Sequence, residues 1–145
     1  MKYLSILFAA VCACCLVAAA GCIGTDKAPN DLTENPWILD YFVGGNIAEH
    51  PAEGSMITLA FSQDRSYSGN GGINSYQGTY TVSGKNLTLG KPSSTKMGGS
   101  AALTAQENQY LSNLEAVASY TVTDRKLTVY DTAGNTIMIF EEYLV

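Results

Sequence analysis

The sequence predicts a mainly β domain of the α+β class, in which antiparallel strands and hairpins wrap around one helix. Short runs rich in Tyr, Thr, Val and Ile alternate with turns that contain Gly, Asp and Ser, as expected of half-buried strands. A single segment carries apolar residues at helical spacing instead. The stretch 36–145 has the length of one small domain and is long enough for one hydrophobic core without disulfides.

The first strand is predicted at Trp37–Val43, where Gly44 and Gly45 end it. Hairpins are predicted around Gly84 and around Asp124-Arg125, because turn residues there separate two β-type runs. The further strands are expected at 56–61, 66–69, 77–82, 86–89, 119–123, 126–130 and 136–140.

One helix is predicted, at about Ala105–Val117. The run Thr104-Ala-Gln-Glu107 has the form of a capping box, in which the Thr hydroxyl accepts from the amide three residues on and the Glu reaches back. The apolar stripe that follows has helical spacing and consists of Tyr110, Leu111, Leu114, Val117 and Ala118. We therefore expect this helix to lie across a sheet.

All four cysteines, Cys12, Cys14, Cys15 and Cys22, lie near the start of the chain. Residues 1–21 have the pattern of an export signal, with one lysine, an uncharged apolar stretch and small residues before Cys22. A lipoprotein signal peptidase needs such small residues and a thiol that carries the lipid, so Cys22 is predicted to be lipidated. The stretch is also long enough for an uncleaved membrane helix, and a buried core helix is the third alternative. The first two place the rest of the chain on the extracytoplasmic side of the cell membrane or envelope.

The polar residues 22–35 are predicted to form a flexible tether, and the domain is predicted at 36–145. Removal of residues 1–21 would also remove Lys2 and make the formal charge of −5 more negative by one unit. The remaining chain is acidic and has no basic stretch. Nucleic acid is therefore not expected as a partner, because phosphate binding needs clustered Lys and Arg.

Residues of the kind that carry catalysis or bind metals are scarce. His50 is the single histidine and lies in a polar loop, without a Gly-x-Ser-x-Gly elbow or zinc-ligand spacing elsewhere. The run that begins at Asp64 resembles the start of a calcium loop, but its twelfth position is Ser75, and a hairpin turn is the better interpretation. No catalytic residue, metal site or cofactor is predicted, and the chain is not expected to be an enzyme. The tyrosines are expected to pack their rings in strands with the hydroxyls in solvent, although they could also line a ligand surface.

The order of several short motifs resembles the META (HslJ-like) domain, a module found in envelope lipoproteins. The matching segments are Trp37-Ile-Leu39, Thr58-Leu-Ala-Phe61, Ser68-Gly69, Gly72-Ile-Asn-Ser-Tyr-Gln-Gly-Thr-Tyr80, Thr95-Lys-Met97 and Gln106-Glu-Asn-Gln-Tyr-Leu111. Each motif is short, but together they cover almost all of the domain. The residues that carry the match most clearly are Gly72, Asn74, Gly78, Tyr80, Thr95 and Met97. We expect structural roles for them, with Asn and Gly shaping a tight turn and Met filling a core gap, and a binding site is the alternative.

The chain departs from the family pattern at two positions. The resemblance implies a cysteine where Ile73 stands and a second where Gly99 stands, and these two are thought to form a disulfide in many family members. Such a link would contribute roughly 3–4 kcal/mol by loop-entropy reasoning. We expect the lost link to be replaced in part by burial of Ile73, which is worth about 1.5–3 kcal/mol.

The resemblance implies a compact fold without catalytic residues and an association with stress tolerance, secretion or motility. The predicted function is that of a lipid-anchored extracytoplasmic domain with a non-catalytic binding or structural role. It is expected to be attached to the membrane through Cys22 or through an uncleaved helix. Its expected partner is an unidentified envelope protein. The alternative is a lipoprotein that binds a small ligand or glycan through exposed tyrosines. A cleft lined by Tyr67, Tyr76 or Asn74 would favour that alternative, whereas a closed core would favour the first.

Overall fold

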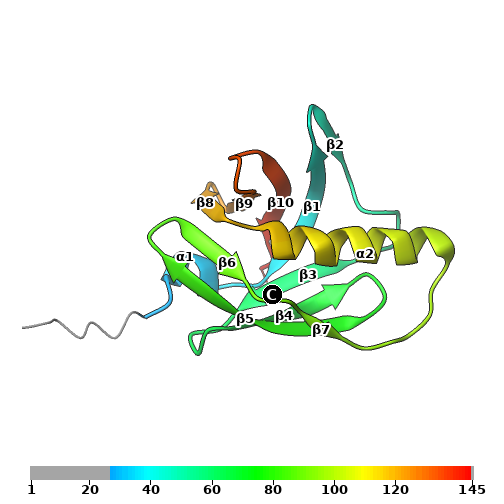
Figure 1. Cartoon of the computed structure of the whole chain (residues 1–145), viewed down its shortest axis with the longest axis horizontal. Helices are drawn as coiled ribbons and strands as arrows, with labels where there is room; N and C mark the ends of the chain where they lie inside the picture. The colour runs from blue at the N-terminus through cyan, green and yellow to red at the C-terminus, as the bar shows by residue number, and fades with distance from the viewer. Residues whose placement is uncertain (1–26, 145) are drawn as a thin grey trace, which may run out of the picture.

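The computed structural model describes residues 27–144, so the predicted signal at 1–21 and Cys22 lie outside the described residues. Within them, eight strands form a closed antiparallel sheet, drawn in Figure 1. The strands are β1 (Trp37–Gly44), β3 (Ile57–Phe61), β4 (Ser66–Gly71), β5 (Ser75–Ser83), β6 (Asn86–Leu89), β8 (Ser119–Thr123), β9 (Lys126–Tyr130) and β10 (Thr136–Glu142). The mainly β fold class is therefore confirmed.

The strands follow one another around the closed sheet in the order β1, β10, β9, β8, β6, β5, β4 and β3, and β3 pairs with β1 again. β6 and β8 overlap only briefly, where Asn86 lies opposite Ser119. Two further short strands add to the outside of this circuit. β2 (Ile47–Glu49) pairs with β1, and β7 (Ser93–Ser94) pairs with β5.

The interior of the sheet follows from the alternation of residues along each strand. In β3, for example, Ile57, Leu59 and Phe61 are buried and the residues between them are not. This period of two is the pattern of a strand with one face in the core. The other strands contribute Trp37, Leu39, Tyr67, Tyr76, Tyr80, Leu87, Tyr120, Leu127, Val129, Met138 and Phe140 to the same core.

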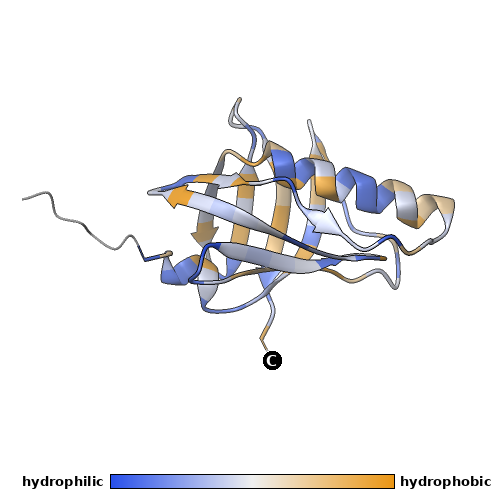
Figure 2. Cartoon of the chain, turned by 60° about the horizontal axis from the view of Figure 1, so that its bottom comes forward, coloured by the Kyte–Doolittle hydropathy of each residue, from blue (hydrophilic) through white to orange (hydrophobic). Residues whose placement is uncertain are grey.

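The long helix α2 (Ala101–Ala116) lies over the sheet beside β4 and β6, and its ribbon alternates between hydrophilic and hydrophobic residues (Figure 2). Glu107, Tyr110 and Leu114 form its buried face. The helix starts earlier than predicted, because Ser100 is the N-cap and its side chain accepts from Leu103 N at 3.2 Å. Ala-Ala-Leu after Ser100 has high helix propensity, so the capping box predicted at Thr104 was wrong.

The predicted tether is ordered in its second half. α1 (Asn30–Thr33) covers one edge of the core beside β3, and Ala28 and Leu32 are fully buried. The indole Nε1 of Trp37 donates to Leu32 O at 3.1 Å. The prediction of a tether up to residue 35 was therefore wrong, because Ala28 and Leu32 pack into the core and Leu32 accepts from the Trp37 indole. Neither helix found within residues 27–144 has the length and apolar character needed to cross a bilayer.

We predict that Leu32→Ala lowers the free energy of unfolding by about 2–5 kcal/mol, since it removes a fully buried side chain. Asn30→Ala is the matched control, because Asn30 is exposed in the same helix. Urea unfolding followed by circular dichroism measures both. Equal stability of the Leu32→Ala variant and the unsubstituted protein would mean that the segment is a tether after all.

Candidate functional site

Three of the six matching segments meet in a hydrogen-bonded group that we call the Asn74 network, formed by Ile73, Asn74, Thr95, Met97 and Glu107. These residues come from the turn between β4 and β5, from the segment between β7 and α2, and from α2 itself. Segments that are distant in the sequence are thereby held at one place in the fold.

Glu107 accepts three of the hydrogen bonds in this network. Its Oε1 accepts from Asn74 N at 2.6 Å and from Ile73 N at 3.3 Å, and its Oε2 accepts from Asn74 Nδ2 at 2.7 Å. The residue is only 6% exposed. Burial of a carboxylate is costly unless its oxygens are hydrogen-bonded, and these donors satisfy them.

The Asn74 side chain is fully used by its neighbours. Its Oδ1 accepts from Met97 N at 2.7 Å and from Thr95 Oγ1 at 2.9 Å, while its Nδ2 also donates to Met97 O at 3.2 Å. Among residues 27–144, no buried side-chain nitrogen or oxygen lacks a hydrogen-bond partner. The polar atoms of Asn74 and Glu107 are therefore engaged within the protein.

The turn before Asn74 depends on glycine at two positions. Gly72 has a φ of +107°, which an L side chain rarely adopts. A Cβ at Gly71 would lie 2.7 Å from Glu107 Oε1, so only glycine leaves room for the carboxylate. The structure thus places Gly72 and Asn74 in the tight turn that was predicted.

Met97 does not fill a core gap, as the sequence had suggested. Its side chain is 67% exposed, and Asn74 binds the main-chain N–H and C=O groups of Met97.

Gly78 and Tyr80 lie on β5, apart from the network. A Cβ at Gly78 would come within 2.6 Å of the Tyr67 ring, and the Tyr80 hydroxyl donates to Ser62 O at 2.8 Å.

Four core tyrosines bond their hydroxyls inside the protein, namely Tyr67, Tyr76, Tyr80 and Tyr110. For these residues the prediction that the hydroxyls face solvent was wrong. Tyr67 donates to Gly90 O at 2.5 Å, and Tyr76 donates to Thr58 O at 2.6 Å and lies 2.7 Å from the Tyr110 hydroxyl. Burial raises the pKa of Tyr67 to about 12 and raises the pKa of Tyr76 further. An exposed tyrosine surface at Tyr67 and Tyr76 is thereby ruled out, because these side chains are 1% and 3% exposed.

The two positions where the family pattern has cysteines lie in contact. A Cβ built on Gly99 would overlap Ile73 Cδ1 and lie 3.0 Å from Ile73 Cγ1. In a disulfide, the Cβ of one cysteine lies about 3 Å from the sulfur of the other, as an S–S bond of about 2.05 Å requires. The Ile73 side chain therefore occupies the volume where such a bridge would stand.

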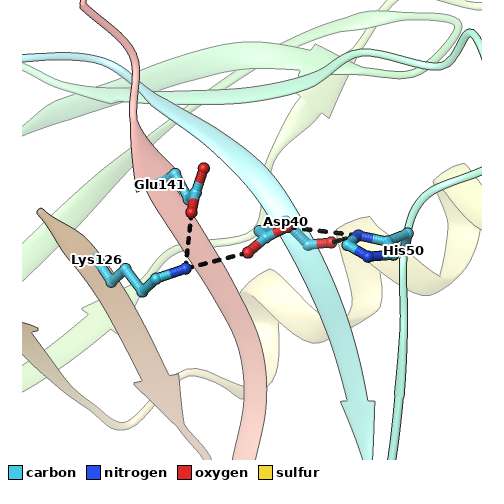
Figure 3. Close-up of polar contacts among 4 residues, drawn as sticks. All are labelled: Asp40, His50, Lys126 and Glu141. Carbon is cyan, nitrogen blue, oxygen red and sulfur yellow. Dashed lines mark hydrogen bonds and ion pairs between the residues drawn. The ribbon is translucent and has the colours of Figure 1, made fainter.

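A second polar group lies on the outer face of β1, β9 and β10 and consists of Asp40, His50, Lys126 and Glu141 (Figure 3). Lys126 Nζ is 2.7 Å from Glu141 Oε1 and 3.3 Å from Asp40 Oδ2. These contacts raise the pKa of Lys126, and the Lys126 hydrogen bond lowers that of Glu141. The His50 Nδ1 lies 2.8 Å from Asp40 O, with its side chain 63% exposed. Exposed pairs of this kind contribute little to stability.

The predicted turn at Asp64 is confirmed as the hairpin between β3 and β4. Asp64 Oδ1 accepts from Ser66 N at 3.0 Å and from Ser66 Oγ at 2.6 Å. In the part of the chain that the structure describes, no three His, Cys, Asp or Glu side chains are grouped so that they could hold a metal ion.

The fold is a small closed antiparallel sheet with one long helix across it, and the Glu107 carboxylate of this helix is hydrogen-bonded to the turn between β4 and β5. The chain belongs to the META domain family, whose sequence model matches residues 30–143. A comparison with curated proteins found no match.

Two solved structures show the same fold. A protein from Burkholderia xenovorans, solved by NMR, is similar with a TM-score of 0.67 and 25% identity, over 79% of this chain and 85% of that one. A DUF4847 family protein from Bacteroides vulgatus, solved by crystallography, is similar with a TM-score of 0.57 and 14% identity, over 77% of this chain and 94% of that one.

We predict that Ile73→Cys combined with Gly99→Cys forms a disulfide in oxidising buffer and raises the melting temperature. The same double variant under reducing conditions is the control, because it has the substitutions without the bond. Thiol titration and thermal unfolding measure the two effects. A thiol count that is equal in oxidising and reducing buffer would contradict the proximity of the two positions.

Proposed function

We propose that this chain is a lipid-anchored extracytoplasmic META domain with a non-catalytic binding or structural role in the cell envelope. The observation that carries the non-catalytic part is the Asn74 network. The family-motif residues Asn74, Thr95 and Met97 spend their polar atoms on one another and on Glu107. Their geometry serves to hold segments together, and Glu107 accepts three hydrogen bonds from the protein itself.

The position of the folded domain relative to Cys22 supports a location at a membrane surface. Ala28 is already buried in the domain, so only residues 23–27 separate it from Cys22. A segment of this length spans at most about 20 Å when extended, from about 3.3–3.6 Å per residue. A lipid on Cys22 would therefore keep the domain close to the membrane. An uncleaved helix over the preceding apolar residues would have the same effect.

Lipidation is tested by growing cells that express the chain with a radioactive fatty acid. We expect label on the unsubstituted protein, no label on Cys22→Ser, and full label on Cys15→Ser, which changes a cysteine ahead of the expected cleavage site. Absence of label from the unsubstituted protein would contradict the lipid anchor. Retention of residues 1–21 in that unlabelled protein, seen by mass spectrometry, would then support the uncleaved helix.

The structural or binding role implies a partner in the envelope, and the family resemblance associates that role with stress tolerance. Chemical cross-linking in intact cells asks for the partner directly. A specific cross-linked product that depends on the folded domain supports the proposal. A chain that remains uncross-linked under normal and stress conditions speaks against a protein partner.

A further inference from the structure

A shallow pocket of about 350 Å³ opens where β7 pairs with β5. It is lined by Ser75, Tyr76, Gln77, Ser93, Ser94 and Thr95. We propose that this pocket binds a neutral saccharide of one or two sugar units. Its volume lies at the lower end of the range usual for small-molecule sites.

The chemistry of the lining matches a ligand that is rich in hydroxyl groups. In the described part of the chain, the side chains of Ser75, Gln77, Ser93 and Ser94 have no hydrogen-bond partner within the protein. Hydroxyl and carboxamide groups both donate and accept, as sugar hydroxyls and acetamido groups do. These side chains are therefore free to exchange water for a ligand that offers the same pattern of donors and acceptors.

The absence of charge from the lining of this pocket selects against ionic ligands. None of the six lining residues is Asp, Glu, Lys, Arg or His. Phosphates and carboxylates are bound best by charged donors, which form the stronger hydrogen bonds. The Tyr76 ring offers no surface to a ligand, because it lies in the core and its hydroxyl is bonded to Thr58 and Tyr110. A neutral ligand with polar edges fits this uncharged lining.

The Asn74 network holds the rim of this pocket in place. Thr95 N donates to Ser75 O at 3.1 Å, and Thr95 Oγ1 donates to Asn74 Oδ1 at 2.9 Å. Ser94 lies opposite Tyr76 and Ser93 opposite Gln77 in the β5–β7 ladder. The pocket walls are therefore fixed before a ligand arrives, which reduces the entropy lost on binding.

This inference rests on the binding role under the proposed function, and it does not depend on the lipid. It is tested with the full chain in detergent, titrated with two neutral disaccharides, N,N′-diacetylchitobiose and maltose, and followed by heteronuclear NMR. We expect saturable shifts from at least one disaccharide at residues 75–77 and 93–95. Gln77→Ala should weaken binding about three- to tenfold, as expected for one lost hydrogen bond. Thr81→Ala is the matched control, because Thr81 is exposed on the same strand outside the pocket.

Three results would overturn the assignment. One is the lack of saturable shifts at these residues with either disaccharide. Another is equal affinity of the Gln77→Ala variant and the unsubstituted chain, provided that the melting temperature shows both to be folded. The third is tighter binding of an uncharged peptide, acetyl-tetraalanine amide, at the same residues, which would make the site a peptide site. Failure of the fatty-acid labelling would leave this test unaffected, so the two proposals fail separately.

Discussion

The Glu107 carboxylate is the group on which the arrangement of this domain depends. It lies on the buried face of α2 and accepts hydrogen bonds from the turn between β4 and β5. Through Asn74 it also fixes the segment that leads into α2. A buried carboxylate that loses its donors is strongly unfavourable, so the helix, the turn and the connecting segment are stable only together. This explains why three of the matching segments, which are distant in the sequence, converge in space.

The rest of the domain is stabilised by packing of its core, in which buried tyrosines lie among the aliphatic side chains. Three tyrosines on β4, β5 and α2 pack in this core, namely Tyr67, Tyr76 and Tyr110. The hydroxyl of each donates a hydrogen bond to a main-chain carbonyl oxygen. At the position where the family pattern implies a disulfide, Ile73 lies against Gly99. The contact keeps the turn beside the start of α2 without a covalent bond. The burial of Ile73 that the sequence suggested is incomplete, because this side chain is only half-buried, and the hydrogen bonds of Asn74 and Glu107 also hold this region.

The strands could be predicted from the sequence because a period of two in residues such as Ile57, Leu59 and Phe61 needs no tertiary information. β2 and β7 could not, since both are short and largely exposed. The start of α2 was missed because Ser100 and Thr104 are both suitable caps, and the Ala-Ala-Leu run between them continues the helix back to Ser100. The burial of Leu32 depends on the position of Trp37, which local composition does not contain. The role of Glu107 was missed for the same reason, as its partners lie in a distant turn.

The same limit applies to the candidate sites. The motif residues could be identified by resemblance, but their grouping around Glu107 required the fold. The pocket between β5 and β7 has no sequence signal, because serine, threonine and glutamine in a polar stretch are typical of any exposed strand.

Native-state hydrogen exchange in a Glu107→Gln variant tests most directly whether the buried carboxylate holds the helix, the turn and the connecting segment together. The glutamine amide would face the Asn74 donors, so we predict a loss of about 1–3 kcal/mol of stability and faster exchange at the Ile73, Asn74 and Met97 amides. Glu115→Gln, an exposed position on the same helix, should change neither quantity. Unchanged stability and unchanged exchange at those three amides in Glu107→Gln would contradict the account.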